Sequence, residues 1–139
     1  MRNSLLLIVT ASAAAVGCGE QGDFSYVAVS GVVTVGGEPA EGVLVTFNPR
    51  QSGEGIATGG SSIGRTDADG RFTLRSTLPA RSPGAVPGPH KVTFRGSGDI
   101  PDPDAPEDAI RLPSRYVEEG VLFDVPGDGT SAADFALET

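Results

Sequence analysis

Residues 66–74 read TDADGRFTL, and this short stretch combines a turn with a strand. Its aspartate side chains can accept hydrogen bonds from backbone N–H groups, and its glycine tolerates the left-handed conformation that closes a tight turn. Residues 71–75 then alternate, with Phe72 and Leu74 on one face and polar side chains on the other. The stretch therefore predicts a hairpin turn followed by a strand that buries one face.

The same period-two alternation occurs on both sides of this stretch. Apolar residues lie on one face of six further segments: 27–35, 43–48, 62–66, 90–95, 121–125 and 133–138. A strand with one apolar face must be covered, and two antiparallel sheets that face each other cover both. The sequence thus predicts an all-β fold, a seven-strand antiparallel β-sandwich over residues 27–139.

Phenylalanines mark the expected core of this sandwich. Five of them occupy inward positions on five different predicted strands: Phe47, Phe72, Phe94, Phe123 and Phe135. We expect these rings to converge on one core.

Two segments do not fit strands. Residues 49–61 are rich in glycine and lack an apolar pattern, which predicts a surface loop. Residues 96–110 hold five acidic residues and three prolines, which predicts an extended, solvated segment that buries nothing.

Composition narrows the class of protein. The chain has 139 residues, enough for one domain. Its formal net charge of −8 argues against a nucleic-acid partner, which would need a basic face. The single cysteine excludes an intrachain disulfide.

The first segment predicts export. Residues 1–17 read MRNSLLLIVTASAAAVG, and from residue 5 onward they carry no charge. About 20 apolar residues are needed to span a membrane, so this helical segment fits a signal peptide better than a membrane span. It ends in Ala15, Val16 and Gly17, directly before Cys18.

This ending resembles the lipobox of bacterial lipoproteins. The resemblance implies that the Cys18 thiol receives a diacylglycerol and that the chain is cut before it. Residues 1–17 would then be a lipoprotein signal peptide and residues 18–26 a tether. The domain would sit in the cell envelope, lipid-anchored on the periplasmic or outer-membrane face. An ordinary signal peptide with a chance cysteine, or an N-terminal helix of the domain, are the alternatives.

The domain itself resembles a known family. The motifs lie at residues 30–33 (SGVV), 36–45 (GGEPAEGVLV), 66–74 (TDADGRFTL) and 88–92 (GPHKV). In this order they resemble the carboxypeptidase regulatory-like domain, a transthyretin-like (prealbumin-type) Greek-key β-sandwich. Residues 112–116 and 134–137 are similar to small bacterial lipoproteins that carry this domain. The resemblance leaves function open, because the fold hosts adhesion modules, enzyme accessory domains, carriers and structural stalks.

Candidate catalytic residues are few. His90 is the single histidine and stands where the family usually has an aromatic residue, so we expect it at the edge of the core. Residues 60–64 read GSSIG and match G-x-S-x-G, but no helix is predicted after them, as a nucleophile elbow requires, and we interpret the glycine-rich residues 59–64 as part of a loop. No G-x-x-x-x-G-K motif occurs. In the DADG sequence the glycine follows the second aspartate directly, which fits a turn and not a calcium loop. The acidic residues 99–108 could bind Ca²⁺ weakly, although the prolines hold their carboxylates apart.

The sequence thus predicts a non-catalytic, lipid-anchored envelope domain without a cofactor or a bound metal. Its partners would be the membrane, through the lipid on Cys18, and an envelope protein or glycan. An accessory module that presents a small ligand or calcium to another envelope protein is the alternative.

Overall fold

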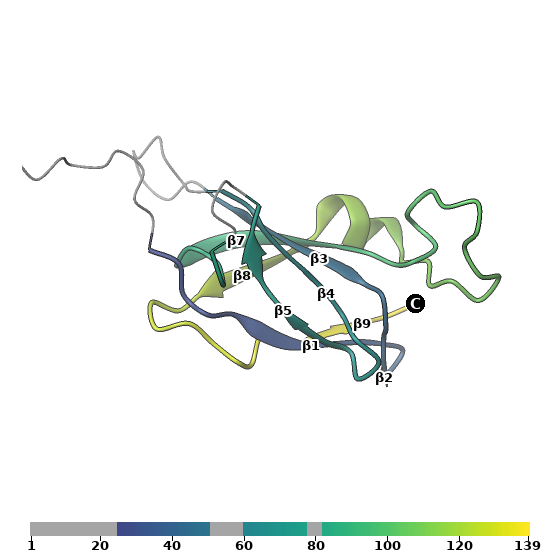
Figure 1. Cartoon of the computed structure of the whole chain (residues 1–139), viewed down its shortest axis with the longest axis horizontal. Coiled ribbons are helices and arrows are strands. Elements are labelled where there is room, and N and C mark those ends of the chain that lie inside the picture. Colours follow the sequence, from purple (N-terminus) through teal and green to yellow (C-terminus); the bar gives the residue numbers. More distant parts are fainter. Residues whose placement is uncertain (1–24, 51–59, 78–81) are drawn as a thin grey trace, which may run out of the picture.

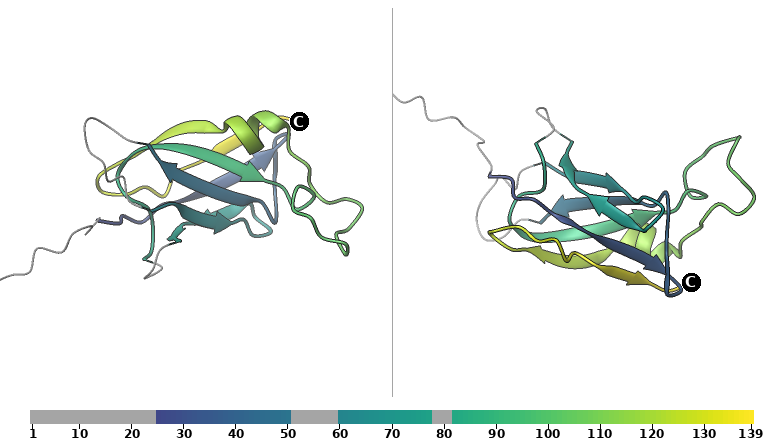
Figure 2. Two further views of the ribbon diagram at one scale, coloured as in Figure 1. Left: turned by 90° about the horizontal axis from the view of Figure 1, so that it is seen from above. Right: turned by 60° about the horizontal axis from the view of Figure 1, so that its bottom comes forward.

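The computed structural model describes residues 25–50, 60–77 and 82–139. These residues form two β-sheets that face each other, with one short helical turn, η1 (Arg115–Glu119), beside them (Figures 1 and 2). The predicted all-β fold is confirmed.

The larger sheet has five strands, and every neighbouring pair in it is antiparallel. Across the sheet the strands are β6 (Arg75–Ser76), β4 (Ser62–Arg65), β3 (Leu44–Pro49), β7 (Gly88–Arg95) and β8 (Val121–Val125).

The smaller sheet is built around β1 (Ser30–Val35). This strand pairs with β2 (Glu38–Pro39), β5 (Arg71–Thr73) and β9 (Phe135–Leu137). The expectation that all pairs are antiparallel is wrong for β1 and β9, which run parallel. The chain reaches β9 from β8, in the opposite sheet, so no hairpin forces the two strands to run in opposite directions.

The strand predicted at residues 71–75 is divided between the two sheets. Its first part, β5, pairs with β1, whereas its second part, β6, pairs with β4. Leu74 lies between them, fully buried, and its backbone N–H donates to the carbonyl of Val29 at 3.0 Å. Gly64 of β4 allows the close approach, because a Cβ there would lie 2.7 Å from the backbone oxygen of Thr73.

The two short strands β2 and β6 were not expected as separate elements. A turn at Gly36 and Gly37 produces β2, because positive φ angles of 61° and 88° fold the chain back within two residues. Glu38 then pairs with Val35 of β1.

The core confirms the predicted convergence of the five phenylalanines. Phe135 lies among the other four rings, with centroid distances of 5.0 Å to Phe94, 5.5 Å to Phe123, 6.0 Å to Phe47 and 6.3 Å to Phe72. These rings come from both sheets, so this aromatic cluster joins the two layers.

The acidic segment 96–110 protrudes from one end of the sandwich (Figure 1). Hydrogen bonds nevertheless hold its base against the domain. The Oδ2 atom of Asp99 accepts hydrogen bonds from the backbone N–H groups of Gly96 and Leu112, both at 2.9 Å. Ile110 packs against the core. The expectation that this segment buries nothing is therefore wrong at its base, where one carboxylate ties both ends of the loop together.

The turn in residues 66–74 has the predicted form. The Oδ1 atom of Asp67 accepts hydrogen bonds from the backbone N–H groups of Asp69 and Arg71, each at 2.9 Å. Gly70 has a φ of 75°, and its carbonyl accepts a 2.8 Å hydrogen bond from the N–H of Val33. The turn is thus fastened to β1 as well as closed by its own side chain.

The two aspartates of this turn provide a matched test of that geometry. Asp67→Ala leaves two backbone N–H groups without their acceptor, and we expect the free energy of unfolding to fall by about 1 kcal/mol. Asp69→Ala removes the same charge from a side chain that accepts neither bond, and we expect little change. Urea denaturation of both variants measures the difference. Equal losses would show that Asp67 does not hold the turn.

Candidate functional site

The sequence predicts His90 at the edge of the core, but the structure places its side chain inside the core. It is 1% exposed, and its ring centroid lies 5.6 Å from that of Phe47. The Nδ1 atom lies 2.8 Å from the carbonyl oxygen of Gly88, so Nδ1 carries the proton and donates it. Within the part of the chain that the structure describes, the buried Nε2 atom has no hydrogen-bond partner.

This environment keeps the imidazole neutral. Burial lowers the pKa of His90 below 6.5, because the charged form loses its hydration. The hydrogen bond to Gly88 and the negative charge of Asp124 oppose this shift. Since the Nε2 atom is closed off from solvent, His90 fits a core residue better than a group that exchanges protons with a substrate.

The outer face of the five-stranded sheet gathers positive charge. The strand register places Leu44 between Arg65 of β4 and Arg95 of β7. In the next row, Ile63 of β4 stands beside Arg75 of β6. These side chains point outward because their neighbours along each strand are buried.

Lys91 of β7 lies on the same face, opposite Leu122 of β8. Four of the ten cationic residues of a chain with a net charge of −8 thus share one surface. The acid nearest in register is Asp124, on the edge strand β8. We call this surface the basic face and define it by its outward side chains: Leu44, Ile63, Arg65, Arg75, Lys91 and Arg95.

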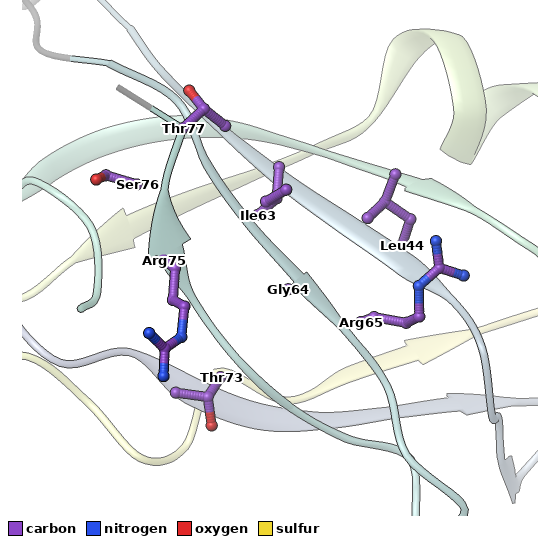
Figure 3. Close-up of a pocket in the computed structure, with 8 residues that line it drawn as sticks. All are labelled: Leu44, Ile63, Gly64, Arg65, Thr73, Arg75, Ser76 and Thr77. Carbon is purple, nitrogen blue, oxygen red and sulfur yellow. The ribbon is translucent and has the colours of Figure 1, made fainter. Parts of the chain in front are cut away.

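A hollow of about 470 Å³ opens at one side of the basic face, and residues of β4 and of the strand 71–76 line most of it. Figure 3 shows Arg65 and Arg75 on neighbouring strands, on opposite sides of Gly64. We call this space the β4–β6 hollow. It is lined by Leu44, Ile63, Gly64, Arg65, Thr73, Arg75, Ser76 and Thr77.

The two arginines of the hollow are free to meet a ligand. Arg65 donates a long hydrogen bond of 3.4 Å to the carbonyl of Gly42. Among the described residues, neither Arg65 nor Arg75 forms an ion pair, whereas Arg115 lies 3.8 Å from the carboxylate of Glu138. The hollow therefore offers two guanidinium groups whose charge is not neutralised by a neighbouring carboxylate.

The acidic loop is a second candidate site. A pocket of about 420 Å³ lies within it, and its lining includes Asp99, Asp102 and Arg111. The Oδ2 atom of Asp99 already accepts two backbone hydrogen bonds, and the Oδ1 atom of Asp102 accepts one from the N–H of Asp104 at 2.9 Å. Within the described ranges, no three His, Cys, Asp or Glu side chains gather closely enough to hold a metal ion. These two carboxylates serve the loop's own turns.

The predicted lipid-attachment residue, Cys18, and the predicted lipobox residues before it, Ala15, Val16 and Gly17, lie outside the described residues. None of the helical structure in the described ranges is long and apolar enough to cross a membrane. Compared with known proteins, the chain matches no protein family, no curated protein and no solved structure.

The basic face was missed in the sequence, although the signal was present. Alternation places Arg75, Lys91 and Arg95 at outward positions of their predicted strands. Only the strand order and register reveal that these positions are neighbours, because β6, β4, β3 and β7 are adjacent in the sheet and not in the chain.

The burial of His90 predicts a pH dependence of stability. Because its pKa is lower in the folded than in the unfolded protein, the unfolded chain takes up the proton first as pH falls. The stabilisation that comes with a neutral, buried His90 is therefore fully present above pH 6.5, the pKa of the unfolded chain. It is lost as pH falls through the lower pKa of the folded protein. His90→Phe removes the titrating group from this site. We expect the free energy of unfolding to fall less between about pH 7.5 and about pH 5 in the variant than in the wild type.

Urea denaturation at the two pH values measures both proteins. An equal fall in the two proteins would contradict the role of His90, because the loss would then come from other groups.

Proposed function

We propose that the protein is a lipid-anchored domain of the cell envelope and acts as a non-catalytic interaction module. The observation that carries the proposal is the position of Cys18, directly after an uncharged apolar run that ends in Ala15, Val16 and Gly17. Acyl chains on that thiol would hold the domain at a bilayer, because each buried CH₂ contributes about 0.8 kcal/mol.

The start of the folded domain agrees with this anchor. Val27 exchanges backbone hydrogen bonds of 2.8 and 2.9 Å with Ala85. From this point, nine residues after Cys18 in the sequence, the described chain is tied into the sandwich. The net charge of −8 gives no general attraction to anionic lipid, so the acyl chains would supply the membrane affinity.

The proposal includes a more specific fold than two facing β-sheets, namely a seven-strand Greek-key sandwich. If β5 and β6 are counted as one strand and the two-residue β2 as part of a hairpin, seven principal strands remain. This number, together with the motifs at residues 30–45 and 66–74, supports the Greek-key, transthyretin-like arrangement of carboxypeptidase regulatory-like domains.

The non-catalytic role is supported by the placement of the polar groups. His90 is neutral and buried, whereas Arg65 and Arg75 are exposed beside a hollow. Exposed charge on a rigid sheet suits recognition, and the proposed partner is an envelope protein or glycan.

Metabolic labelling with a clickable palmitate analogue tests the anchor. We expect the wild type to be labelled and to fractionate with membranes. Cys18→Ser should be unlabelled, because it lacks the thiol that receives the diacylglycerol.

The control places a thiol elsewhere in the tether. A double variant, Cys18→Ser with Ser25→Cys, keeps one cysteine but moves it away from Ala15, Val16 and Gly17. We expect no label on it. An unlabelled wild type would end the proposal, and a labelled double variant would show that acylation does not depend on the lipobox.

A further inference from the structure

We propose that the β4–β6 hollow binds an acidic carbohydrate, through the carboxylate and hydroxyl groups of uronate units. The inference rests on the proposed function, since it names the class of partner for the interaction module. It is carried by the joint presence of guanidinium groups, hydroxyl groups and an apolar floor in one hollow.

The first step of the argument is charge. Arg65 and Arg75 flank the hollow and form no ion pair with the described residues. A guanidinium group presents a planar fork of donors that matches a carboxylate in two parallel hydrogen bonds. Lys91 and Arg95 extend the positive charge across the sheet, so successive carboxylates of a chain-like ligand would meet further cations.

The second step is recognition of hydroxyl groups. Thr73 and Thr77 line the hollow. Within the described residues the Thr73 hydroxyl makes no hydrogen bond, so it can both donate and accept. The Thr77 hydroxyl donates to the carbonyl of Ser61 at 3.0 Å and keeps its lone pairs for an incoming hydroxyl.

The third step is the apolar floor. Ile63 is 39% exposed and lies next to Arg75 in register, while Leu44 lies next to Arg65. A pyranose ring has C–H groups on its faces that can cover such side chains. Small-ligand sites combine an apolar lining with a few placed polar groups in volumes of roughly 300–1,000 Å³, and a hollow of about 470 Å³ fits that range.

An extended peptide cannot bind at the β4–β6 hollow by adding a strand to the sheet. The outer edge of β6 is already covered, because Arg75 pairs with Pro83 and the N–H of Ser76 donates to the carbonyl of Ser82 at 2.9 Å. Strand addition requires an open row of backbone groups. A ligand of the hollow must therefore be bound by side chains.

An anionic bilayer fits the basic face less well than a single glycan chain does, because a bilayer is flat and wide. A flat membrane that approaches the basic face also approaches Asp124, on the edge strand β8, and meets a domain of net charge −8. Charges are screened over about 8 Å at physiological salt, so a single glycan strand lying on the basic face would respond mainly to the local cations.

Calorimetric titration of the full-length chain carrying Cys18→Ser tests the inference, because this substitution removes the lipid and leaves the sandwich residues unchanged. The probe is tetragalacturonate, and maltotetraose is the neutral control of equal length. We expect saturable binding of the uronate probe only, with Arg65→Gln and Arg75→Gln each weakening it about tenfold.

Arg111→Gln serves as the matched control, because it removes the same charge from an exposed residue outside the basic face. We expect its affinity to equal that of the parent. The far-ultraviolet circular dichroism of all variants reports whether the sandwich is intact.

Several results would overturn the inference. These are no binding of tetragalacturonate, equal binding of maltotetraose, or an equal loss in Arg111→Gln. Arginine-dependent binding to phosphatidylglycerol vesicles in place of the sugar would assign the basic face to a membrane. None of these results concerns the label on Cys18, so the anchor stands or fails separately.

Discussion

The packing of Phe135 against four other phenylalanines is the contact on which the fold depends. Its ring lies within 6.3 Å of rings from β3, β5, β7 and β8. To bring it there, the chain leaves β8 in one sheet and enters the other sheet as β9, parallel to β1. The cluster fills the space between the layers, because aromatic rings bury large apolar areas. The sheets therefore close around the last strand of the chain, and not around a local hairpin.

The path of the strand 71–76 is a second constraint, and it shapes the β4–β6 hollow. The strand 71–76 begins in one sheet and ends in the other, and Leu74 is buried at the crossing. Gly64 and Gly70 make this path possible, since a Cβ at either would meet backbone oxygen at 2.7 or 2.5 Å. Residues of β4 and of this strand line most of the β4–β6 hollow. A packing requirement of the core thus also positions two arginines on either side of an open space.

Charge is divided between the parts of the fold. Many carboxylates lie in turns and loops, where Asp67 and Asp99 accept backbone hydrogen bonds, whereas Asp124 lies on β8 and Glu38 on β2. Cations occupy outward positions on β4, β6 and β7. The single histidine contributes to neither group, because burial beside Phe47 keeps it neutral. A domain with net negative charge can therefore still offer a positive face to a ligand that is narrow enough to avoid the acids.

The sequence by itself determined the all-β class, the inward phenylalanines and the turn at residues 66–74. These features follow from alternation and from local hydrogen bonding, which act within a few residues. Only the tertiary structure decided the parallel pairing of β9, the division of strand 71–76 and the ordered base of the acidic loop. It also decided the basic face, whose four cations come from three different strands, β4, β6 and β7. Pairing and register depend on contacts between distant segments, and a period-two pattern states which face is buried but not which strand lies beside it.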